Sequence, residues 1–380
     1  MNHFLEYTFI LKDTRIKRKR VLPPEVAGGE VLVEEGDDVL PHTKVVSGTI
    51  PSEYRIIDVA TALGLDADDA DRLREIIKLK PGDRLKEGQP LGEWRRRQRW
   101  MPKAPSNSIV RLVDHGRVIL ESRPHTVQIA AQLIGRVTEV IPRQGAVIET
   151  RGAVLQCAWG NGRYSAANFA FEPGFEYGNV NSPQGGLIEL LGQDVTLSRY
   201  RGQAVVLLRP LTAVDLEVAV DQEMAGLVAP SMPINLREKA MQLKVPVILT
   251  EGFGRLQPTL RIFDLLAELR AQGNAMLILE GALPDYRRNR RPELLVPTGS
   301  NLSGAPVAET NAPLLAGMQV RVRRAPYLGR VGEVLEVLDQ PVVLENGLRV
   351  LCAQVKFPSG DRAIVPLANL DSLGEKPPAW

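Results

Sequence analysis

The stretch Thr250–Arg255 holds the residue types best suited to binding a ligand. Glu251 offers a carboxylate and Arg255 a cation, while Gly252 and Gly254 let a backbone approach a ligand closely. The stretch follows VPVILT, a nearly continuous apolar run that is typical of a parallel strand covered on both faces. Ligands of open α/β sheets bind where strands end and helices begin, so we predict a binding turn here. A glycine turn in which Glu251 caps the next helix is the alternative.

Catalysis has less support in the sequence. The run VILTEG is similar to the first strand of a Toprim-type nucleotidyl fold, in which a glutamate acts with an acidic D-x-D around magnesium. The next predicted strand ends at Glu280 without a D-x-D, and Asp285 follows only after Pro284, whereas two-metal catalysis needs clustered carboxylates. The histidines are scattered, and neither H-E-x-x-H nor C-x-x-C occurs. We therefore favour a non-enzymatic protein without a cofactor, although distant residues could still assemble a catalytic triad.

A second chemistry is indicated where arginines lie next to aromatic residues. Arginine side chains neutralise phosphates and indole rings stack on bases, which is what a single-stranded nucleic-acid surface needs. The alternative is an exposed loop whose tryptophans pack back onto the domain. The candidate residues are Trp94, Arg95, Arg96, Arg97, Arg99 and Trp100. Two further basic runs, Arg15–Arg20 and Arg287–Arg291, are either phosphate contacts or solvated segments.

The segment Gly317–Val337 contains the most specific motif of the chain. A valine-rich strand is followed by a turn at Pro326 and Gly329, a G-x-V at Gly332, and a second strand. This pattern resembles a KOW motif, which implies a five-stranded SH3-like barrel. Proteins with this module, such as NusG-type elongation factors and several ribosomal proteins, bind RNA, the ribosome or RNA polymerase; in some families the module contacts only proteins. The residues placed for phosphate contact and stacking are Arg321, Arg323, Arg324, Tyr327 and Arg330.

The first half of the chain repeats a glycine-rich strand pattern. Residues 79–94 and 117–156 resemble the two half-motifs of a biotinyl/lipoyl-like barrel-sandwich hybrid, with Leu133–Gln156 as the clearest part. In the carrier proteins of that family, a lysine at the hairpin tip between the halves holds biotin or lipoate. Pro124 stands at the corresponding position, and a proline cannot form that amide. We therefore predict a rigid framework that carries neither biotin nor lipoate.

The elements that must position these residues are mostly strands, with one α/β unit. Glycine and proline number 33 and 28 among 380 residues, which suits short strands and tight turns. Apolar positions predict buried strands at 226–232 and 245–250 and an amphipathic helix at 258–271, hence a three-layer βαβαβ unit. The predicted segments are a strand with a basic run at 1–20, a barrel-sandwich-hybrid-like β domain at 21–157 with a helical insertion at 55–78, a β-rich connection at 158–225, the α/β unit at 226–297, a linker at 298–316 and the KOW or SH3-like barrel at 317–380.

The overall charge and the apolar runs restrict location and partners. The net charge is +2, so nucleic-acid binding would depend on local patches. Two cysteines, the absence of an apolar run near about 18 residues and the absence of a signal peptide predict a reduced cytoplasmic protein without membrane contact. Our first hypothesis is a non-enzymatic adaptor that contacts RNA, the ribosome or RNA polymerase through the KOW-like barrel and the basic loops. The alternatives are a protein–protein scaffold in a larger assembly and a ligand-binding α/β unit at Thr250–Arg255.

Overall fold

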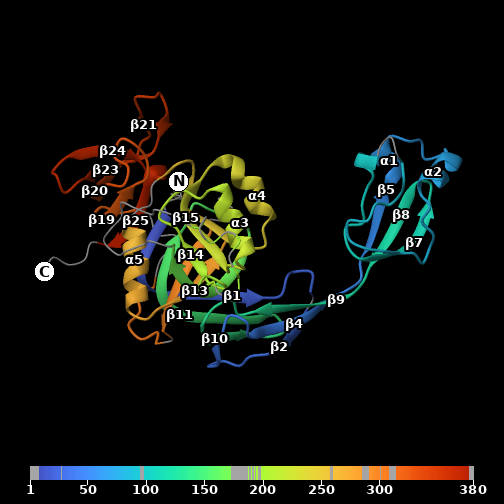
Figure 1. Cartoon of the computed structure of the whole chain (residues 1–380), viewed down its shortest axis with the longest axis horizontal. Coiled ribbons are helices and arrows are strands. Elements are labelled where there is room, and N and C mark those ends of the chain that lie inside the picture. Colours follow the sequence, from blue (N-terminus) through green and yellow to red (C-terminus); the bar gives the residue numbers. More distant parts are fainter. Residues whose placement is uncertain are drawn as a thin grey trace.

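The chain is mostly β with one α/β unit, as its sequence predicts. Figure 1 shows a large body, a C-terminal sheet beside it, and a small module that extends away from the body on an arm of two strands. No helix in the described part of the chain is long and apolar enough to cross a membrane. The computed structural model describes residues 8–26, 28–94, 98–172, 187, 190, 192, 194–195, 198–256, 260–284, 291–299, 301–307 and 314–375.

The α/β unit has four neighbouring parallel strands towards one edge of the main sheet. In their order across the sheet these strands are β13 (Tyr164–Phe171), β14 (Ala204–Val206), β15 (Gly226–Met232) and β16 (Val247–Phe253). The helical elements that connect or follow the last three strands are α3 (Ala213–Asp221), the 3-10 turn Ile234–Leu236, α4 (Arg237–Gln242) and α5 (Leu260–Ala271). A βαβαβ arrangement is therefore present, and it is formed by β14, α3, β15, α4 and β16. It begins before residue 226, where the sequence placed the start of the unit, and the strand that follows α5 pairs antiparallel with its neighbours.

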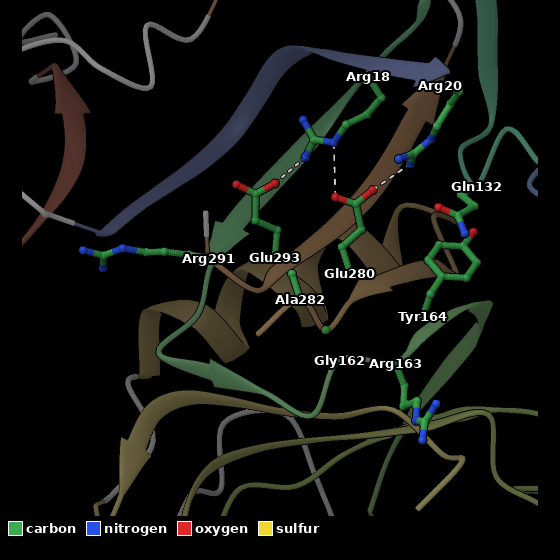
Figure 2. Close-up of a pocket in the computed structure, with 11 residues that line it drawn as sticks. Arg18, Arg20, Gln132, Gly162, Arg163, Tyr164, Glu280, Ala282, Arg291 and Glu293 are labelled. Carbon is green, nitrogen blue, oxygen red and sulfur yellow. Dashed lines mark hydrogen bonds and ion pairs between the residues drawn. The ribbon is translucent and has the colours of Figure 1, made fainter. Parts of the chain in front are cut away.

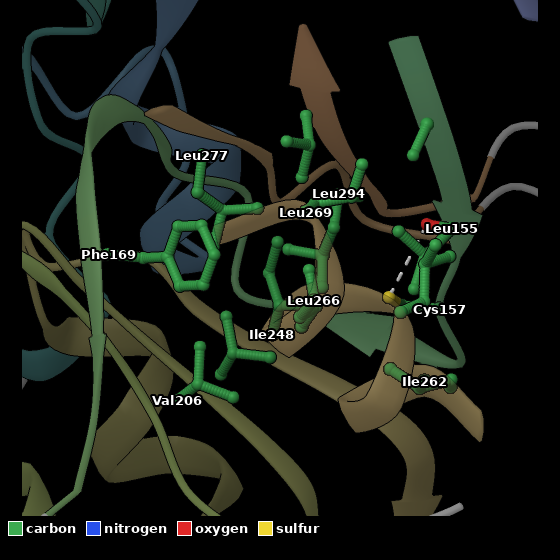
Figure 3. Packing of buried hydrophobic residues seen from close by; sticks show 14 of the residues in the cluster. Leu155, Cys157, Phe169, Val206, Ile248, Ile262, Leu266, Leu269, Leu277 and Leu294 are labelled. Carbon is green, nitrogen blue, oxygen red and sulfur yellow. Dashed lines mark hydrogen bonds between the residues drawn. The ribbon is translucent and has the colours of Figure 1, made fainter. Parts of the chain in front are cut away.

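Both faces of the parallel strands are covered by helices. Val206 and Val228 pack with buried residues of α5, and Figure 3 shows this cluster. Val205 and Leu227, their neighbours in sequence, pack with residues of α3 and α4 on the other face. Successive side chains of a strand point to opposite faces, so burial on both faces explains why these strands read as continuous apolar runs.

The parallel strands begin earlier in the chain than residue 226. Strands β13 and β14 precede that position, and residues 216–220, which lie in the segment expected to be β-rich, belong to helix α3. A capping box fixes the start of this helix: the Thr212 hydroxyl accepts from the Asp215 backbone, and the Asp215 carboxylate accepts from the Thr212 backbone at 2.7 Å. The segment therefore forms a helix that starts at this capping box, although valines such as those that follow it favour strands.

Beyond β13 the sheet continues with antiparallel neighbours and curves around a second buried cluster. The strands are, in order, β17 (Met276–Glu280), β18 (Glu293–Gly299), β11 (Gly145–Gln156) and β1 (Thr8–Val21). Strand β1 contains the whole basic run 15–20, and the side chains of this run differ in their exposure. Ile16 is buried in the cluster and the side chains of Arg18 and Arg20 follow on the same face, whereas Lys17 and Lys19 are exposed.

The first half of the chain contains one β-module nested within another. The outer module comprises β2 (Gly29–Val31), β3 (Asp38–Val39), β4 (Lys44–Ile50), β9 (His125–Ala130) and β10 (Gly135–Ile141). The inner module, at the end of the arm formed by β4 and β9, comprises β5 (Tyr54–Asp58), α1 (Val59–Leu63), α2 (Ala70–Ile76), β6 (Arg84–Leu85), the 3-10 turn Gln98–Trp100, β7 (Ser108–Asp114) and β8 (Arg117–Ser122).

The same turn precedes a two-residue strand in each module. The Asp37 carboxylate accepts from the backbone of Glu34 and the Asp83 carboxylate accepts from the backbone of Lys80, both at 2.8 Å. The glycine before each aspartate has a φ of 96° or 97°, which a residue with a side chain rarely adopts. The repeat seen in the sequence is therefore also a repeat of local structure. Residues 79–94 lie in the inner module, whereas most of 117–156 lies outside it.

The C-terminal sheet is antiparallel, with the strand order β25-β19-β20-β23-β24. Its elements are β19 (Met318–Val322), β20 (Val331–Val337), the hairpin of β21 (Val342–Val343) and β22 (Arg349–Val350), β23 (Cys352–Lys356), β24 (Arg362–Pro366), the 3-10 turn Leu367–Asn369 and β25 (Leu370–Glu375). The peptide bond before Pro326 is cis. Strand β25 also pairs in parallel with β1, which joins this sheet to the main one.

Candidate anion-binding pocket

A pocket of about 700 Å³ opens where the α/β unit meets the C-terminal sheet. From the α/β unit it is lined by the end of β16, the first residue of α4 and the short strand β12 (Trp159–Gly160), which pairs with β16. From the C-terminal sheet it is lined by the residues directly after β19 and by the 3-10 turn before β25. The pocket therefore lies at the carboxyl end of a parallel strand, where open α/β sheets bind ligands.

The predicted glycine turn forms one wall of this pocket. Gly252 and Gly254 have φ values of 112° and 123°, a region that favours glycine. The backbone N–H of Gly254 donates to the carbonyl of Met232, so the turn is held against the end of β15. Glu251 lies within β16 and its carboxylate pairs with Arg321, so the structure does not show it as the cap of the next helix.

Glu251 and the C-terminal sheet are joined by a buried ion network. Arg321 lies with its Nη1 atom 3.3 Å from Glu251 Oε1, and its Nε donates to Asp371 Oδ2 at 2.9 Å. The three side chains are between 1% and 7% exposed. Burial raises the pKa of the Asp371 carboxyl, against the opposing effect of the nearby guanidinium groups. Arg321 was predicted to contact nucleic acid, but its burial and its carboxylate partners exclude that role.

Arginines outnumber carboxylates around the pocket. The charged lining residues among those described are Glu251, Arg237, Arg291, Arg323 and Arg324. Arg323 has its Nε 3.5 Å from Asp371, whereas Arg237 and Arg324 are exposed and their side chains have no hydrogen bond or ion pair with another described residue. Because Arg321 already neutralises Glu251, the surplus positive charge of the pocket faces solvent and favours an anion.

An apolar wall completes the pocket. Phe253 is half-buried and its ring lies 5.3 Å from that of Trp159, measured between centroids. Leu283 also lines the pocket and is 48% exposed. Arginines next to exposed apolar surface provide contacts for a ligand with both a charged and a flat apolar part.

The other predicted residues of the C-terminal sheet lie outside the pocket. The Arg330 guanidinium is stacked 4.0 Å from the Phe357 ring centroid and donates to Ser359 Oγ at 2.6 Å. Tyr327 is half-buried against the same ring, with the centroids 5.3 Å apart. The hydrogen bonds from Ser359 and Arg330 lower the pKa of Asp361. Arg330 and Tyr327 therefore contribute to the packing of this edge of the sheet.

The remaining candidates are dispersed. Arg255 is exposed and does not line the pocket. Trp94 packs against the core of the inner module with Arg72 stacked on its ring at 5.4 Å, whereas Trp100 is 69% exposed and Arg99 is also exposed. Arg95, Arg96 and Arg97 lie outside the described residues. Figure 1 places the inner module at the opposite end of the molecule from the C-terminal sheet, so the two predicted nucleic-acid surfaces do not form one face.

A second pocket, of about 580 Å³, shows what the basic run of β1 contacts. Figure 2 shows Arg18 and Arg20 reaching from β1 to two carboxylates at the ends of β17 and β18. Glu280 lies 3.2 Å from Arg18 and 2.9 Å from Arg20, and Arg18 also pairs with Glu293. Burial raises the pKa of the Glu293 carboxyl. These arginines neutralise two half-buried acids, so they are not free to bind phosphates in the way that one interpretation of the sequence required.

Sequence reasoning missed three residues of the first pocket: Arg237, Leu283 and Trp159. Arg237 follows β15 and begins α4, so the rule that ligands bind at strand ends could have indicated it. Arg291 was predicted only as part of a basic run; it is buried and lines both pockets, while residues 285–290 lie outside the described residues. No pattern in the sequence pointed to Leu283 or Trp159, because these residues come close to β16 only in the folded protein.

No group of three or more His, Cys, Asp and Glu side chains within the described ranges is arranged to hold a metal ion. Comparisons with protein-family models, with curated proteins and with solved structures found no match.

Proposed function

We propose that the chain is a non-enzymatic adaptor that binds RNA, with phosphates held in the arginine-lined pocket. The observation that carries this proposal is the meeting of Arg237 and Arg324 at one pocket, where neither side chain has a partner among the described residues. Guanidinium groups bind phosphate oxygens with two parallel hydrogen bonds, which makes exposed arginines effective phosphate ligands.

The resemblance of residues 317–337 to a KOW motif supports the choice of RNA over other polyanions. This resemblance implies RNA, the ribosome or RNA polymerase as partners. The β domain at 21–157, which resembles a barrel-sandwich hybrid in sequence, is then a rigid framework for the binding surface. Both cysteines are buried and free, which fits a reducing compartment such as the cytoplasm.

The proposal is tested by filter binding of single-stranded RNA at two salt concentrations. Each phosphate contact contributes about 0.7 to the slope of log affinity against log salt on single strands. The double variant Arg237→Gln, Arg324→Gln should therefore bind more weakly and lose about 0.7 from this slope if the pair holds one phosphate, or about 1.4 if it holds two. The matched control is Arg349→Gln, Arg362→Gln, which removes the same charge from exposed positions of the C-terminal sheet. Salt-independent retention, or equal losses in both double variants, would contradict the proposal.

A protein–protein scaffold is the second candidate function, and one surface favours it. On the outer face of the inner module, Ile56 and Leu112 both pair in register with Ile119, and they are 67% and 46% exposed. Tyr54 continues this apolar face and is 64% exposed. Exposed apolar patches of this kind mark interaction sites. Purification of the tagged protein with and without nuclease separates the two functions, because partners of a scaffold remain bound after nuclease treatment.

A further inference from the structure

We propose that the arginine-lined pocket binds a terminal nucleotide, with its phosphate monoester between Arg237 and Arg324 and its base against Phe253 and Leu283. This inference rests on the proposed function in one respect only: the nucleotide is taken to be the end of an RNA strand. The chemistry recognised is a nucleoside monophosphate, which a strand end and a free nucleotide share.

The charge of the pocket favours a terminal phosphate over an internal one. Arg237 approaches from the start of α4, and Arg323 and Arg324 approach from the end of β19, so guanidinium groups converge from two separate parts of the fold. A phosphate monoester carries up to two negative charges and three free oxygens at neutral pH. An internal phosphodiester carries one charge and two free oxygens, and so it would leave part of this positive surplus unmatched.

Glu251 does not oppose the binding of a phosphate. Its carboxylate lies 3.3 Å from Arg321 Nη1 and is 7% exposed, so its charge is neutralised and withdrawn from solvent. The Arg321 guanidinium is shared between Glu251 and Asp371 and is 4% exposed. This buried network joins β19 to β16, and it thereby helps to bring Arg237 and Arg324 to the same pocket.

The size and shape of the site favour one nucleotide. A volume of about 700 Å³ lies within the range of small-molecule pockets, roughly 300 to 1,000 Å³. Proteins that bind the interior of a single strand instead use a groove that follows the backbone over several nucleotides. A concave pocket of this size therefore admits the end of a strand more readily than its middle.

The apolar wall is suited to a base of any type. Phe253 is held against Trp159, and Leu283 also lines the pocket and is 48% exposed, so both present apolar surface to the pocket. Every base has a flat face that can pack on such a wall, so stacking contributes affinity with little sequence preference. We therefore expect the phosphate at the end of the strand, and not the identity of its base, to decide binding.

The test is fluorescence polarisation of the full chain with short single-stranded RNAs of one sequence. One pair of probes carries a 5′-phosphate or a 5′-hydroxyl, and a second pair carries a 3′-phosphate or a 3′-hydroxyl. We expect the phosphorylated member of one pair to bind at least about tenfold more tightly, since a charged pair with the guanidinium groups is lost without it. The variant Arg237→Gln, Arg324→Gln should lose this discrimination, and Arg349→Gln, Arg362→Gln should keep it.

Competition with free nucleoside monophosphate identifies the source of the ligand. Displacement of the probe only by phosphorylated oligonucleotides supports a strand end, whereas displacement at equal concentration by the free nucleotide supports a small-molecule site with the same chemistry. Salt-dependent RNA binding that ignores the terminal phosphate overturns this inference and leaves the proposed function standing. Phosphate-dependent binding of the free nucleotide without any binding of RNA supports the inference and overturns the proposed function. No binding of either ligand overturns both.

Discussion

The buried network at Arg321 gives the most demanding prediction about stability. In the variant Arg321→Met, the carboxylates of Glu251 and Asp371 lose the guanidinium that lies between them, at a site where the three side chains are at most 7% exposed. Removal of one partner from a buried ion pair costs about 3–5 kcal/mol, because an uncompensated charge remains in the interior. Arg323 lies 3.5 Å from Asp371 and compensates part of this charge, so we expect a cost near the lower limit, about 3 kcal/mol.

The effect should be measured by urea unfolding followed at Trp159. This residue lines the pocket beside Glu251, so its fluorescence reports on the junction between the α/β unit and the C-terminal sheet. A background in which Trp94, Trp100 and Trp380 are replaced by Phe leaves Trp159 as the reporter. With a urea dependence of about 1–3 kcal/mol per molar, a loss of about 3 kcal/mol lowers the midpoint by about 1–3 M.

Two further variants make the result interpretable. Arg330→Met removes another arginine of the same sheet, but its partner Asp361 is 67% exposed, and the midpoint should change far less because water screens that pair. The triple variant Glu251→Met, Arg321→Met, Asp371→Leu replaces the whole network with apolar side chains, and it should recover most of the lost stability. If Arg321→Met shifts the midpoint no more than Arg330→Met does, the network does not hold the two sheets together and our reasoning is refuted.

Three further predictions concern other parts of the fold. Burial raises the pKa of Glu293 from its ordinary value of 4.5, so the folded state binds this proton more tightly than the unfolded state does. The free energy of unfolding of the wild type should therefore fall as the pH rises above 4.5. In urea unfolding, the midpoint of Glu293→Gln should rise relative to that of the wild type between mildly acidic and neutral pH. Burial raises the pKa of both Cys157 and Cys352, which keeps the two thiols protonated. Neither thiol should therefore react with a chromogenic thiol reagent in the native protein, and both should react in urea. Rapid labelling of the native protein would contradict this prediction. In chemical denaturation, Gly152→Ala should lower the free energy of unfolding by about 1–3 kcal/mol, because the added Cβ would lie 2.3 Å from a carbonyl oxygen of β18. Gly28→Ala is the control. The Cβ added at Gly28 would meet only the flexible side chain of an arginine, at 3.0 Å.

Local patterns in the sequence predicted much of the fold. The continuous apolar runs of β15 and β16 predicted strands buried on both faces, and the helical spacing after residue 258 predicted α5. The glycine-rich strand pattern of the first half of the chain predicted a repeat, and the structure contains the same turn at Asp37 and Asp83. These features depend on residues that are close in the sequence, and so they can be predicted from one sequence alone.

The candidate site could be predicted only in part. The glycine turn at Gly252 and Gly254 was found because a strand ends there, and both glycines have the positive φ values that such a turn requires. The role of Glu251 was not found, because its partner Arg321 lies 70 residues further along the chain. Arg237 and Arg324 face the same pocket only because β16 and β19 are brought together.

The sequence by itself determined where the charges, the turns and the apolar faces of this protein lie along the chain. The tertiary structure decided which charges are neutralised. Arg18 of β1 pairs with Glu280 and Glu293, which lie 262 and 275 residues away, whereas Arg324 remains exposed. The physical reason is that a charge is defined by the opposite charges within a few ångströms and by its contact with water, and both are set by packing between distant segments. A basic run therefore predicts a positive surface only where the fold has not placed carboxylates against it.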